Sequence, residues 1–387
     1  MPNRLEANIW ELTHKADKSA KEQRRLRTVK LEPERPVRSV AWVTQSGNRW
    51  SLGGEWYRAY RSAAIAGARF GWKTALCDRW ATPPLTGPVT LGTPNGAPVI
   101  PEFIIVRPIR GWRRHLTEIA HRGGQKVIAD LDDDPWSHEE WAGGDRPNDD
   151  CFDEWFPHVD AVLVSTEYLA ERVRERVSCP VHVAPNCYDP FGLGQADPHP
   201  GPVLGTRLWI GARQSGDLEL YDRLVLPLLE DLDLKFCHIG AGDQVNYGNG
   251  PRPSRLTDRG WPEDRLIELP SHPMPQMHKA LEQISIGVIC MSDQPYNRAK
   301  TETHAVELTA AGLPIVAASE HPLYKGVPGR VESTPEAVRA RVLKLLDRRI
   351  WAQESARART WATELSAKRE AEYLAALSSV VEALAMV

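Results

Sequence analysis

Residues 286–319 read IGVICMSDQPYNRAKTETHAVELTAAGLPIVAAS, and this stretch decides the fold. The apolar run that ends near Cys290 predicts a strand covered on both faces, as in a parallel sheet. A polar loop follows, and we expect a helix to begin near Thr301, which can cap its own N-terminus. Gly312 and Pro314 end that helix, and the apolar run after them predicts the next strand. The order strand, helix, strand indicates a β-α-β unit.

The loop and the start of this helix combine the features of an anion site. Free backbone amides at a helix N-terminus favour negative charge, and Lys300 adds a full positive charge there. Lys300, His304 and Glu307 have the spacing i, i+4, i+7, so they share a face if the helix covers them. Glu307 then lies about 10 Å along the axis from Lys300. That separation suits a ligand with a diphosphate at one end and ribose hydroxyls at the other; a charged helix face with a Lys–Glu pair is the alternative.

The same alternation of strands and helices continues on both sides of this stretch. In the first half we expect strands at Ser39–Thr44, Lys73–Asp78, Phe103–Arg107, Lys126–Leu131, Ala161–Ser165 and Val181–Ala184. In the second half we expect them at Arg207–Gly211, Leu234–Ile239, Arg265–Leu269, Ile284–Cys290 and Pro314–Ala318. A segment rich in Pro and Gly, 185–203, separates the halves, and from Thr334 the chain is nearly all helical.

These patterns predict an α/β protein of two domains with C-terminal helices. The expected parts are an N-terminal helical extension (1–38), a first domain (39–190), a linker (191–203), a second domain (204–360) and a C-terminal helix (361–387) that packs back on the first domain. Ligands then belong in the cleft between the domains, at the carboxyl ends of the strands.

The composition of the 387-residue chain excludes several classes of protein. Hydrophobic residues make up 42% and charged residues 26%, a globular mixture that argues against a disordered or collagen-like chain. A net charge of −3 gives no overall field that would draw the chain to nucleic acid or anionic lipid. No apolar run approaches the roughly 18–20 residues of a membrane helix, and no secretion signal or CxxC pair is present. We therefore expect a soluble, cytoplasmic protein without an integral membrane segment.

The stretch 286–319 resembles the donor-site motif of GT-B glycosyltransferases, especially the family 4-like group (glycosyl transferases group 1). The match rests on Asn297–Lys300, on Glu307 and on the run 311–317, AGLPIVA. The resemblance implies the GT-B architecture, two Rossmann-like domains facing a cleft, and it implies that Glu307 binds the ribose of a nucleotide. The family often has a second Glu eight residues upstream, where this chain has Ala299 beside Lys300. Weaker likenesses in family order extend from about residue 40 to 365.

The resemblance and the local patterns together give a set of donor-binding candidates. Glycine loops let backbone amides approach a ligand, and a guanidinium after a strand can fork onto a diphosphate. For Arg213 an ordinary surface arginine is an equal alternative. The donor candidates are Gly53, Gly54, Gly211, Arg213, Asn297, Lys300, Thr301, His304 and Glu307.

Acidic residues follow the expected strand at 126–131, in ADLDDDPW (129–136). Carboxylates at a strand end can orient an acceptor hydroxyl or act as a base, and Asp130 is the candidate for the latter role. Mg²⁺ binding is the alternative. We favour a structural or acceptor-binding role facing the cleft and expect no metal, because GT-B enzymes generally need none for chemistry. The acceptor-binding candidates are Arg107, Asp130, Asp132 and Asp133. Arg107 has a second interpretation, as the partner of these acids.

The resemblance implies a retaining glycosyltransferase, hexosyl- or pentosyl-, that moves a sugar from a nucleotide-sugar donor to an acceptor hydroxyl. The donor is a substrate, and no cofactor is required. Lys300 and Arg213 would take up the charge that develops on the leaving diphosphate. The acceptor is a glycan, a lipid-linked, a protein or a modified DNA hydroxyl.

The DNA alternative is a hydroxymethylated pyrimidine of phage DNA, since the Arg- and Trp-rich sequence resembles phage-encoded glycosyltransferases. The basic stretch 1–38 and Arg110, Arg113 and Arg114 would then supply a groove. A nucleotide-sugar epimerase and a non-catalytic binding protein with the same fold are the remaining alternatives.

Overall fold

The computed structural model describes the main chain in fifteen segments and single positions. These are residues 37–43, 56–77, 79–80, 91–92, 98–107, 113–137, 150–188, 196, 198, 201–207, 215–240, 255–270, 272, 274–319 and 321–386. The predicted extension 1–38 therefore lies almost wholly outside the described residues, as does most of the predicted linker. Among the described helices, none is both long and apolar enough to cross a membrane.

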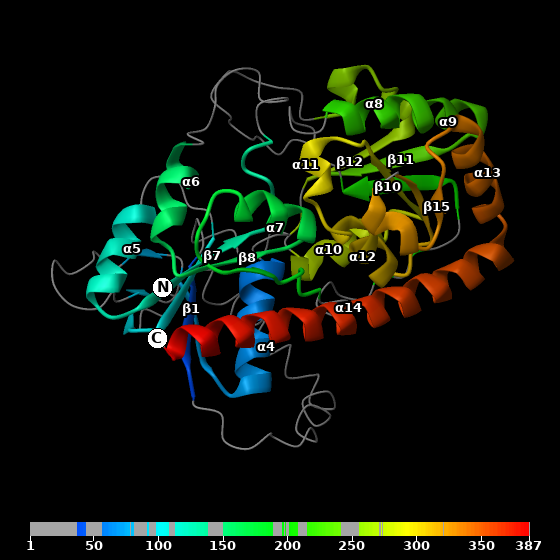
Figure 1. Ribbon diagram of the computed structural model, residues 1–387. Coiled ribbons are helices and arrows are strands. Elements are labelled where there is room, and N and C mark those ends of the chain that lie inside the picture. The colour runs from blue at the N-terminus through cyan, green and yellow to red at the C-terminus, as the bar shows by residue number, and fades with distance from the viewer. Residues whose placement is uncertain are drawn as a thin grey trace, which may run out of the picture.

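The first unit is built on a six-stranded parallel sheet (Figure 1). Its strand order is β2 (Lys73–Cys77), β1 (Ser39–Val43), β6 (Phe103–Val106), β7 (Lys126–Leu131), β8 (Ala161–Val164) and β9 (Val181–Val183). Side chains alternate along β1, so Val40 and Trp42 join one hydrophobic cluster while Ala41 and Val43 join the cluster on the opposite face. Both faces are covered, which explains the continuous apolar runs in the sequence.

The helices of the first unit lie on both faces of this sheet. One face packs on α5 (Arg113–Arg122), α6 (Asp150–Trp155) and α7 (Glu167–Arg174). The other packs on α4 (Arg61–Phe70) and on the last turns of the C-terminal helix. A π-helical turn, η2 (Trp56–Tyr60), precedes α4. A small antiparallel sheet of β3 (Arg79–Trp80), β4 (Leu91–Gly92) and β5 (Pro98–Val99) stands apart.

The second unit repeats the plan with a second six-stranded parallel sheet. Its order is β12 (Leu266–Leu269), β11 (Lys235–Ile239), β10 (Val203–Arg207), β13 (Ile286–Met291), β14 (Ile315–Ser319) and β15 (Arg330–Val331). One face carries α8 (Ser215–Leu224), α9 (Leu226–Asp231) and α13 (Pro335–Leu345), and the other carries α10 (Met277–Leu281) and α12 (Thr303–Ala310). The predicted α/β architecture of two parallel sheets is thus confirmed.

Two element boundaries in the second unit differ from the prediction. The first strand, β10, covers Val203–Arg207 and not Arg207–Gly211, so Arg207 stands at the carboxyl end of the strand. The helix predicted to begin near Thr301 begins at Thr303, and Glu302 holds the N-cap position without a side-chain capping bond. It ends as predicted at Gly312, whose φ of 84° lies in the left-handed region that glycine adopts without strain.

The long C-terminal helix α14 (Arg348–Ala385) joins the two units. Its first turns bury Trp351 and Ala358 against the second unit, and its last turns bury Tyr373 and Leu377 against the first sheet. Figure 1 shows it as one red helix running from the second unit to the first. The sequence placed this final helix at 361–387, whereas the continuous helix begins at Arg348.

Candidate active site

The carboxyl ends of the two sheets face each other across the boundary between the units. The loop before α12 and α12 itself both supply polar contacts from the second unit. Thr166, after β8, has its hydroxyl 3.3 Å from the carbonyl oxygen of Ala299. The Asn186 amide, after β9, donates to the hydroxyl oxygens of Thr301 at 3.0 Å and Thr303 at 3.2 Å. We call residues 292–302, between β13 and α12, the donor loop, after the role that the sequence analysis expects for it.

The order of strands places this loop where a doubly wound sheet binds ligands. In the second sheet the chain runs outward in both directions from β10 and β13, so a crevice opens between their carboxyl ends. Arg207 ends β10, and the donor loop follows β13. In the first sheet the corresponding crevice lies between β1 and β6, and Arg107 follows β6.

Glu307 lies at the boundary of the two units and is 2% exposed. Its Oε1 atom accepts a 3.0 Å hydrogen bond from the hydroxyl of Tyr57, which belongs to the first unit. The same oxygen lies 3.3 Å from the guanidinium of Arg207. Burial raises the pKa of Glu307, and the Arg207 charge and the Tyr57 hydrogen bond oppose this rise without cancelling it.

Lys300 lies on the donor loop and reaches across to the first unit. Its Nζ atom is 3.4 Å from Asp133 Oδ1 and 3.3 Å from the hydroxyl of Tyr296, and it also lies 4.3 Å from the Tyr296 ring centre. Burial by itself lowers the pKa of Lys300, but the Asp133 carboxylate and Tyr296 outweigh it, so the net pKa is raised. The side chain is therefore a fixed cation at the edge of the boundary.

His304 lies one turn before Glu307 on α12. Burial lowers its pKa to about 3, and the charges of Arg207 and Lys300 act in the same direction. The imidazole is therefore neutral near pH 7, and none of the described residues forms a hydrogen bond with its side chain. The charges of Arg207 and Lys300 both act on His304, and Arg207 also pairs with Glu307, so these four groups are electrostatically linked.

Asn297 and Thr301 stabilise the donor loop and its contacts. The carboxylate of Asp217, at the start of α8, accepts hydrogen bonds from the Ser292 amide and hydroxyl, both at 2.7 Å, and from the Asn297 amide at 2.9 Å. Asn297 is 2% exposed. The hydroxyl of Thr301 accepts from Asn186. Both residues were predicted to contact the donor, and their observed bonds are to the protein.

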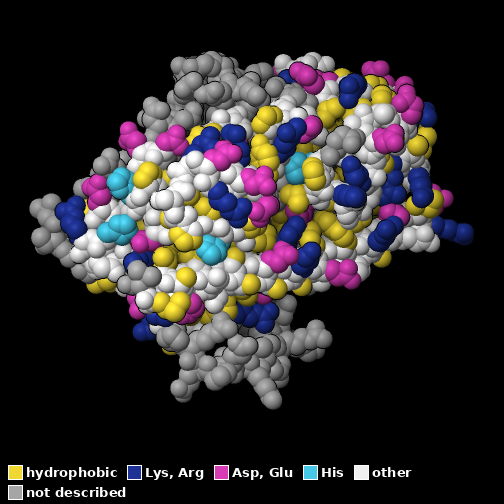
Figure 2. Space-filling view, in the orientation of Figure 1, with side chains coloured by type: hydrophobic (Ala, Val, Ile, Leu, Met, Phe, Trp, Pro, Cys, Tyr) yellow, Lys and Arg dark blue, Asp and Glu magenta, His cyan; other side chains and the backbone are white. Residues whose placement is uncertain are grey.

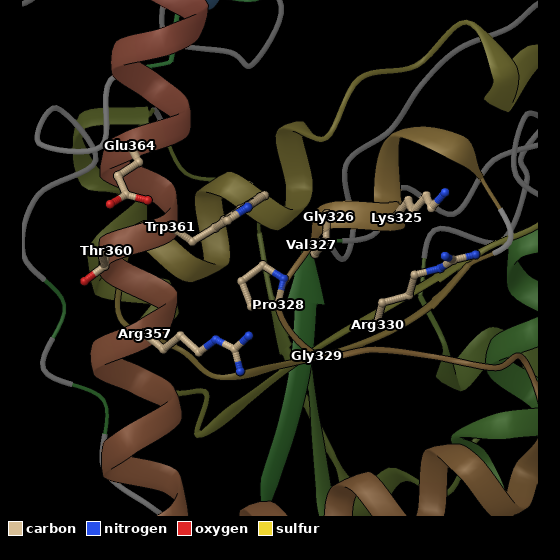
Figure 3. Close-up of a pocket in the computed structure, with 10 residues that line it drawn as sticks. All are labelled: Lys325, Gly326, Val327, Pro328, Gly329, Arg330, Arg357, Thr360, Trp361 and Glu364. Carbon is tan, nitrogen blue, oxygen red and sulfur yellow. The ribbon is translucent and has the colours of Figure 1, made fainter.

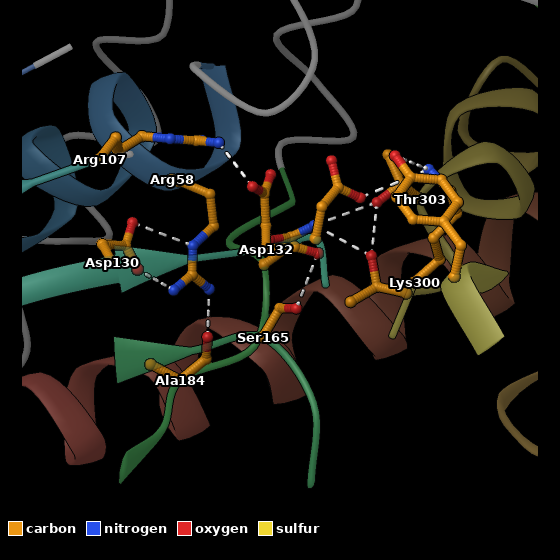
Figure 4. A network of polar contacts seen from close by, with 12 residues as sticks. Arg58, Arg107, Asp130, Asp132, Ser165, Ala184, Lys300 and Thr303 are labelled. Carbon is orange, nitrogen blue, oxygen red and sulfur yellow. Dashed lines mark hydrogen bonds and ion pairs between the residues drawn. The ribbon is translucent and has the colours of Figure 1, made fainter. Parts of the chain in front are cut away.

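The predicted acceptor residues separate into two groups (Figure 4). Arg107 donates a 2.6 Å bond to Asp132, the alternative that the sequence left open. Asp132 and Asp133 are only partly buried, and Asp133 lies 3.4 Å from the Nζ atom of Lys300 across the boundary. Asp130 is fully buried and bound through both oxygens by the guanidinium of Arg58, which also donates to the carbonyl of Ala184.

The geometry corrects the role predicted for Asp130. A carboxylate that is 0% exposed and held by Arg58 cannot meet an acceptor hydroxyl or remove its proton. The ion pair instead joins β7 to the π-helical turn that contains Arg58. Arg58 is 72 residues away in sequence, which explains why no local pattern indicated the pair. Among the described residues, no three His, Cys, Asp or Glu side chains are grouped as metal ligands.

Solved structures share the fold, two parallel six-stranded sheets with helices, over about nine-tenths of the chain. Sucrose-phosphate synthase from Thermosynechococcus elongatus matches with a TM-score of 0.61 at 12% identity, over 90% of this chain and 99% of that one. The α,α-trehalose-phosphate synthase (UDP-forming) from Burkholderia vietnamiensis matches with 0.55 at 10%, over 91% and 100%. A trehalose-6-phosphate protein from E. coli, bound with UDP-2-fluoro glucose, matches with 0.55 at 11%, over 88% and 98%. This is the GT-B fold.

Sequence identities of 10–12% show that the GT-B fold is shared and nothing finer. The family 4-like and phage-like assignments stay predictions. No protein-family model and no curated protein sequence matches the chain. Within the GT-B frame, four predicted donor residues lie outside the described residues, namely Gly53, Gly54, Gly211 and Arg213. The side chains proposed for a DNA groove, at 110, 113 and 114, lie outside them as well. On the face seen in Figure 2, the described charges of both signs are intermixed.

Two residues of the GT-B cleft were not predicted from sequence, Tyr57 and Arg207. Arg207 escaped notice because the apolar run LWI, after it, placed the strand too late, so that the arginine seemed to begin the strand. An arginine at the end of a strand could have indicated the site, since open parallel sheets bind ligands at the carboxyl ends of their strands. Tyr57 is 250 residues from Glu307 in the sequence, and no local spacing indicates their contact.

A separate pocket of about 600 Å³ lies outside the GT-B cleft (Figure 3). It is lined by residues 325–330 and by Arg357, Thr360, Trp361 and Glu364 of α14, and it shares no residue with the site described above. Figure 3 shows Lys325 and Arg330 directed away from α14, so the cations around the pocket do not converge on one point.

Proposed function

We propose that the protein is a glycosyltransferase that binds a nucleotide sugar on its second unit and transfers the sugar to an acceptor hydroxyl bound on the first unit. The observation that supports this most is the position of Glu307: a carboxylate buried at the boundary of the units, held through one oxygen by Tyr57, with the Arg207 guanidinium 3.3 Å from that oxygen. A carboxylate accepts hydrogen bonds from two ribose hydroxyls, and a cation cannot.

The positive groups are placed to take up the charge of a diphosphate. Arg207 ends β10 and Lys300 lies on the loop after β13, so both flank the crevice between these strands. Catalysis would consist of holding the donor and acceptor in position and stabilising the negative charge on the leaving diphosphate. The two side chains supply that charge, and we propose no metal or other cofactor for the step.

The acceptor side would be formed by Asp132 and Asp133 after β7. Asp133 pairs with Lys300 across the boundary, at 3.4 Å, so the acceptor carboxylates and the donor cation face the same space. The reaction breaks the bond between the anomeric carbon and the diphosphate oxygen and forms one to the acceptor oxygen, whose proton passes to the diphosphate. The proposal includes retention at the anomeric carbon, which the resemblance to family 4-like enzymes implies.

Thermal-shift screening against nucleotide sugars tests the proposal. A ligand that binds only the folded state raises the melting temperature by mass action. We expect at least one of the UDP-, GDP-, ADP- and dTDP-sugars to do so, and Glu307→Ala and Lys300→Ala to weaken its binding in calorimetry at least tenfold, because each removes a charged contact. A flat response across the panel would rule out the assignment.

Exposed residues of the same types provide matched controls. Glu282→Ala and Lys344→Ala remove the same charges from exposed positions of the second unit and are expected to leave binding unchanged. Incubating the donor with and without an acceptor hydroxyl separates transfer from epimerisation, because an epimerase converts the donor without an acceptor.

A further inference from the structure

Two aromatic residues of the first unit are packed inside the core of the second. Trp56 and Tyr57 are 6% and 1% exposed, and both belong to the hydrophobic cluster that contains Met274 and Ile289 of the second unit. The Tyr57 ring also meets the Tyr188 ring edge-on, with centres 5.4 Å apart. The first unit is therefore fixed to the second at this corner, and the Tyr57 hydroxyl has a fixed position.

The hydroxyl holds one oxygen of Glu307 and leaves the other free. Oε1 accepts from Tyr57 and faces Arg207, whereas Oε2 has no hydrogen bond within the described residues. A carboxylate attached through a single oxygen can still rotate, and a second fixed donor on that oxygen limits the rotation. Tyr57 and Arg207 approach Oε1 from different units, so together they set the direction of Oε2.

We propose that Tyr57 is a positioning residue of the donor site, contributed by the opposite unit, which fixes the Glu307 carboxylate so that its free oxygen meets a hydroxyl of the donor. This inference rests on the proposed function. Because the ring is buried among apolar side chains, it stays in place when the donor arrives, and only its hydroxyl acts on Glu307. Donor affinity then depends on the contact between the units.

The charged and titratable groups around Glu307 indicate how the effect is measured. Arg207 of β10 and Tyr57 of η2 contact it, His304 lies one turn earlier on its own helix, and Tyr324 of η8 (Pro322–Gly326) is close enough to interact electrostatically. Arg369, from the packed helix α14, pairs with Glu302 instead. Tyr57 and Arg207 both favour the ionised form of Glu307, against the effect of burial.

Tyr57→Phe keeps the ring and removes the hydroxyl. We expect its affinity for the nucleotide sugar that wild type binds, with UDP-glucose as the first probe, to fall about tenfold, the lower end for a hydrogen bond to a charged group. The pKa of Glu307 should rise further, so acid should weaken binding at a higher pH than in wild type. A purely structural role for Tyr57 would leave that pH profile unchanged.

Two further variants complete the test. In a Glu307→Ala background, which leaves no acceptor for the Tyr57 hydroxyl, the Tyr57 substitution should add no more than twofold, since the coupling between the two residues is then absent. Tyr221→Phe is the matched control: it removes a buried hydroxyl that donates a 3.0 Å bond to the Val288 carbonyl, and it should lower the melting temperature without changing affinity or pH profile. Tyr57→Phe keeps the ring and its apolar contacts, so a variant that does not fold would overturn the inference, because the hydroxyl would then support the fold and not the donor site.

The possible outcomes separate the inference from the proposed function. Wild-type protein that binds none of the nucleotide sugars would overturn both. Wild-type binding with an unchanged Tyr57→Phe profile would overturn the inference alone. Tighter binding by Tyr57→Phe would also overturn it, because the hydroxyl would then merely occupy the place of a donor hydroxyl.

Discussion

His304 holds a neutral imidazole close to the positive charges of Arg207 and Lys300, so its protonation state depends on its surroundings. Its pKa of about 3 results from burial and from the charges of Arg207 and Lys300. A neutral ring can both donate and accept a hydrogen bond, which suits the hydroxyl-rich sugar of the proposed donor. Protonation of His304 would add a third positive charge to those of Arg207 and Lys300.

The pKa of His304 predicts a pH dependence of stability. Unfolded histidine has a pKa near 6.5, so between pH 6.5 and 3 the unfolded chain binds a proton that the folded chain does not. The free energy of unfolding therefore falls as the pH decreases through this window. We expect His304→Gln to lose less melting temperature than wild type between pH 7.5 and pH 5. Equal losses in the two proteins would contradict the burial of a neutral imidazole.

The donor loop is the element that the site depends on, and a single carboxylate holds its first half. Asp217 accepts three hydrogen bonds from Ser292 and Asn297, and all three donors lie between β13 and α12. Burial raises the pKa of Asp217, while the bonds from Ser292 and Asn297 oppose that effect. Each bond to a charged group contributes about 1.5–3 kcal/mol, so the loop is ordered by the start of α8.

We expect Asp217→Ala to loosen the donor loop selectively. The amide of Ser292 should exchange with solvent faster in hydrogen-exchange measurements, and donor affinity should fall at least tenfold, since Lys300 is no longer held in place. Amides of β11 and β14 should keep their protection. Protection lost evenly over the second unit would mean that Asp217 supports the whole fold.

Elements were predictable wherever their signals were local. The strands of the first sheet and the end of α12 at Gly312 follow from apolar runs and from the glycine itself. The start of α12 was misplaced because the Thr301 hydroxyl, which looks like a cap, is bound by Asn186 from the first unit. Asp130 was assigned to chemistry because Arg58, its buried partner, is distant in sequence. Interactions between the units decide these cases, and a single sequence does not display them.

At the scale of the whole molecule, α14 connects the two units as one helix of 38 residues, about 57 Å long. Its last turns bury Tyr373, Leu377, Val380 and Val381 against the sheet of the first unit. Salt bridges from Arg61 and Arg69 to Glu370 add to this contact. Arg369, in the same region, pairs with Glu302 at the end of the donor loop.

We expect Leu377→Ala to destabilise the protein by about 2–5 kcal/mol, the usual cost of a cavity at a fully buried leucine. Because α14 packs on both units, calorimetry should still show a single transition, shifted to lower temperature. Leu343→Ala, at a leucine that is 41% exposed on α13, should change the melting temperature little. Two separate transitions in the Leu377 variant would show that the units unfold independently.

The continuity of α14 also limits how the crevice can widen. Because α14 is packed against one unit at each end, any rotation of one unit relative to the other must bend the helix axis. Gentle curvature spread over about ten turns costs little free energy. A large rotation between the units must separate the last turns of α14 from the apolar residues of the first unit. The protein should therefore admit and release its ligands through small rotations, and crystals grown with and without nucleotide should differ by only a few degrees between the two halves.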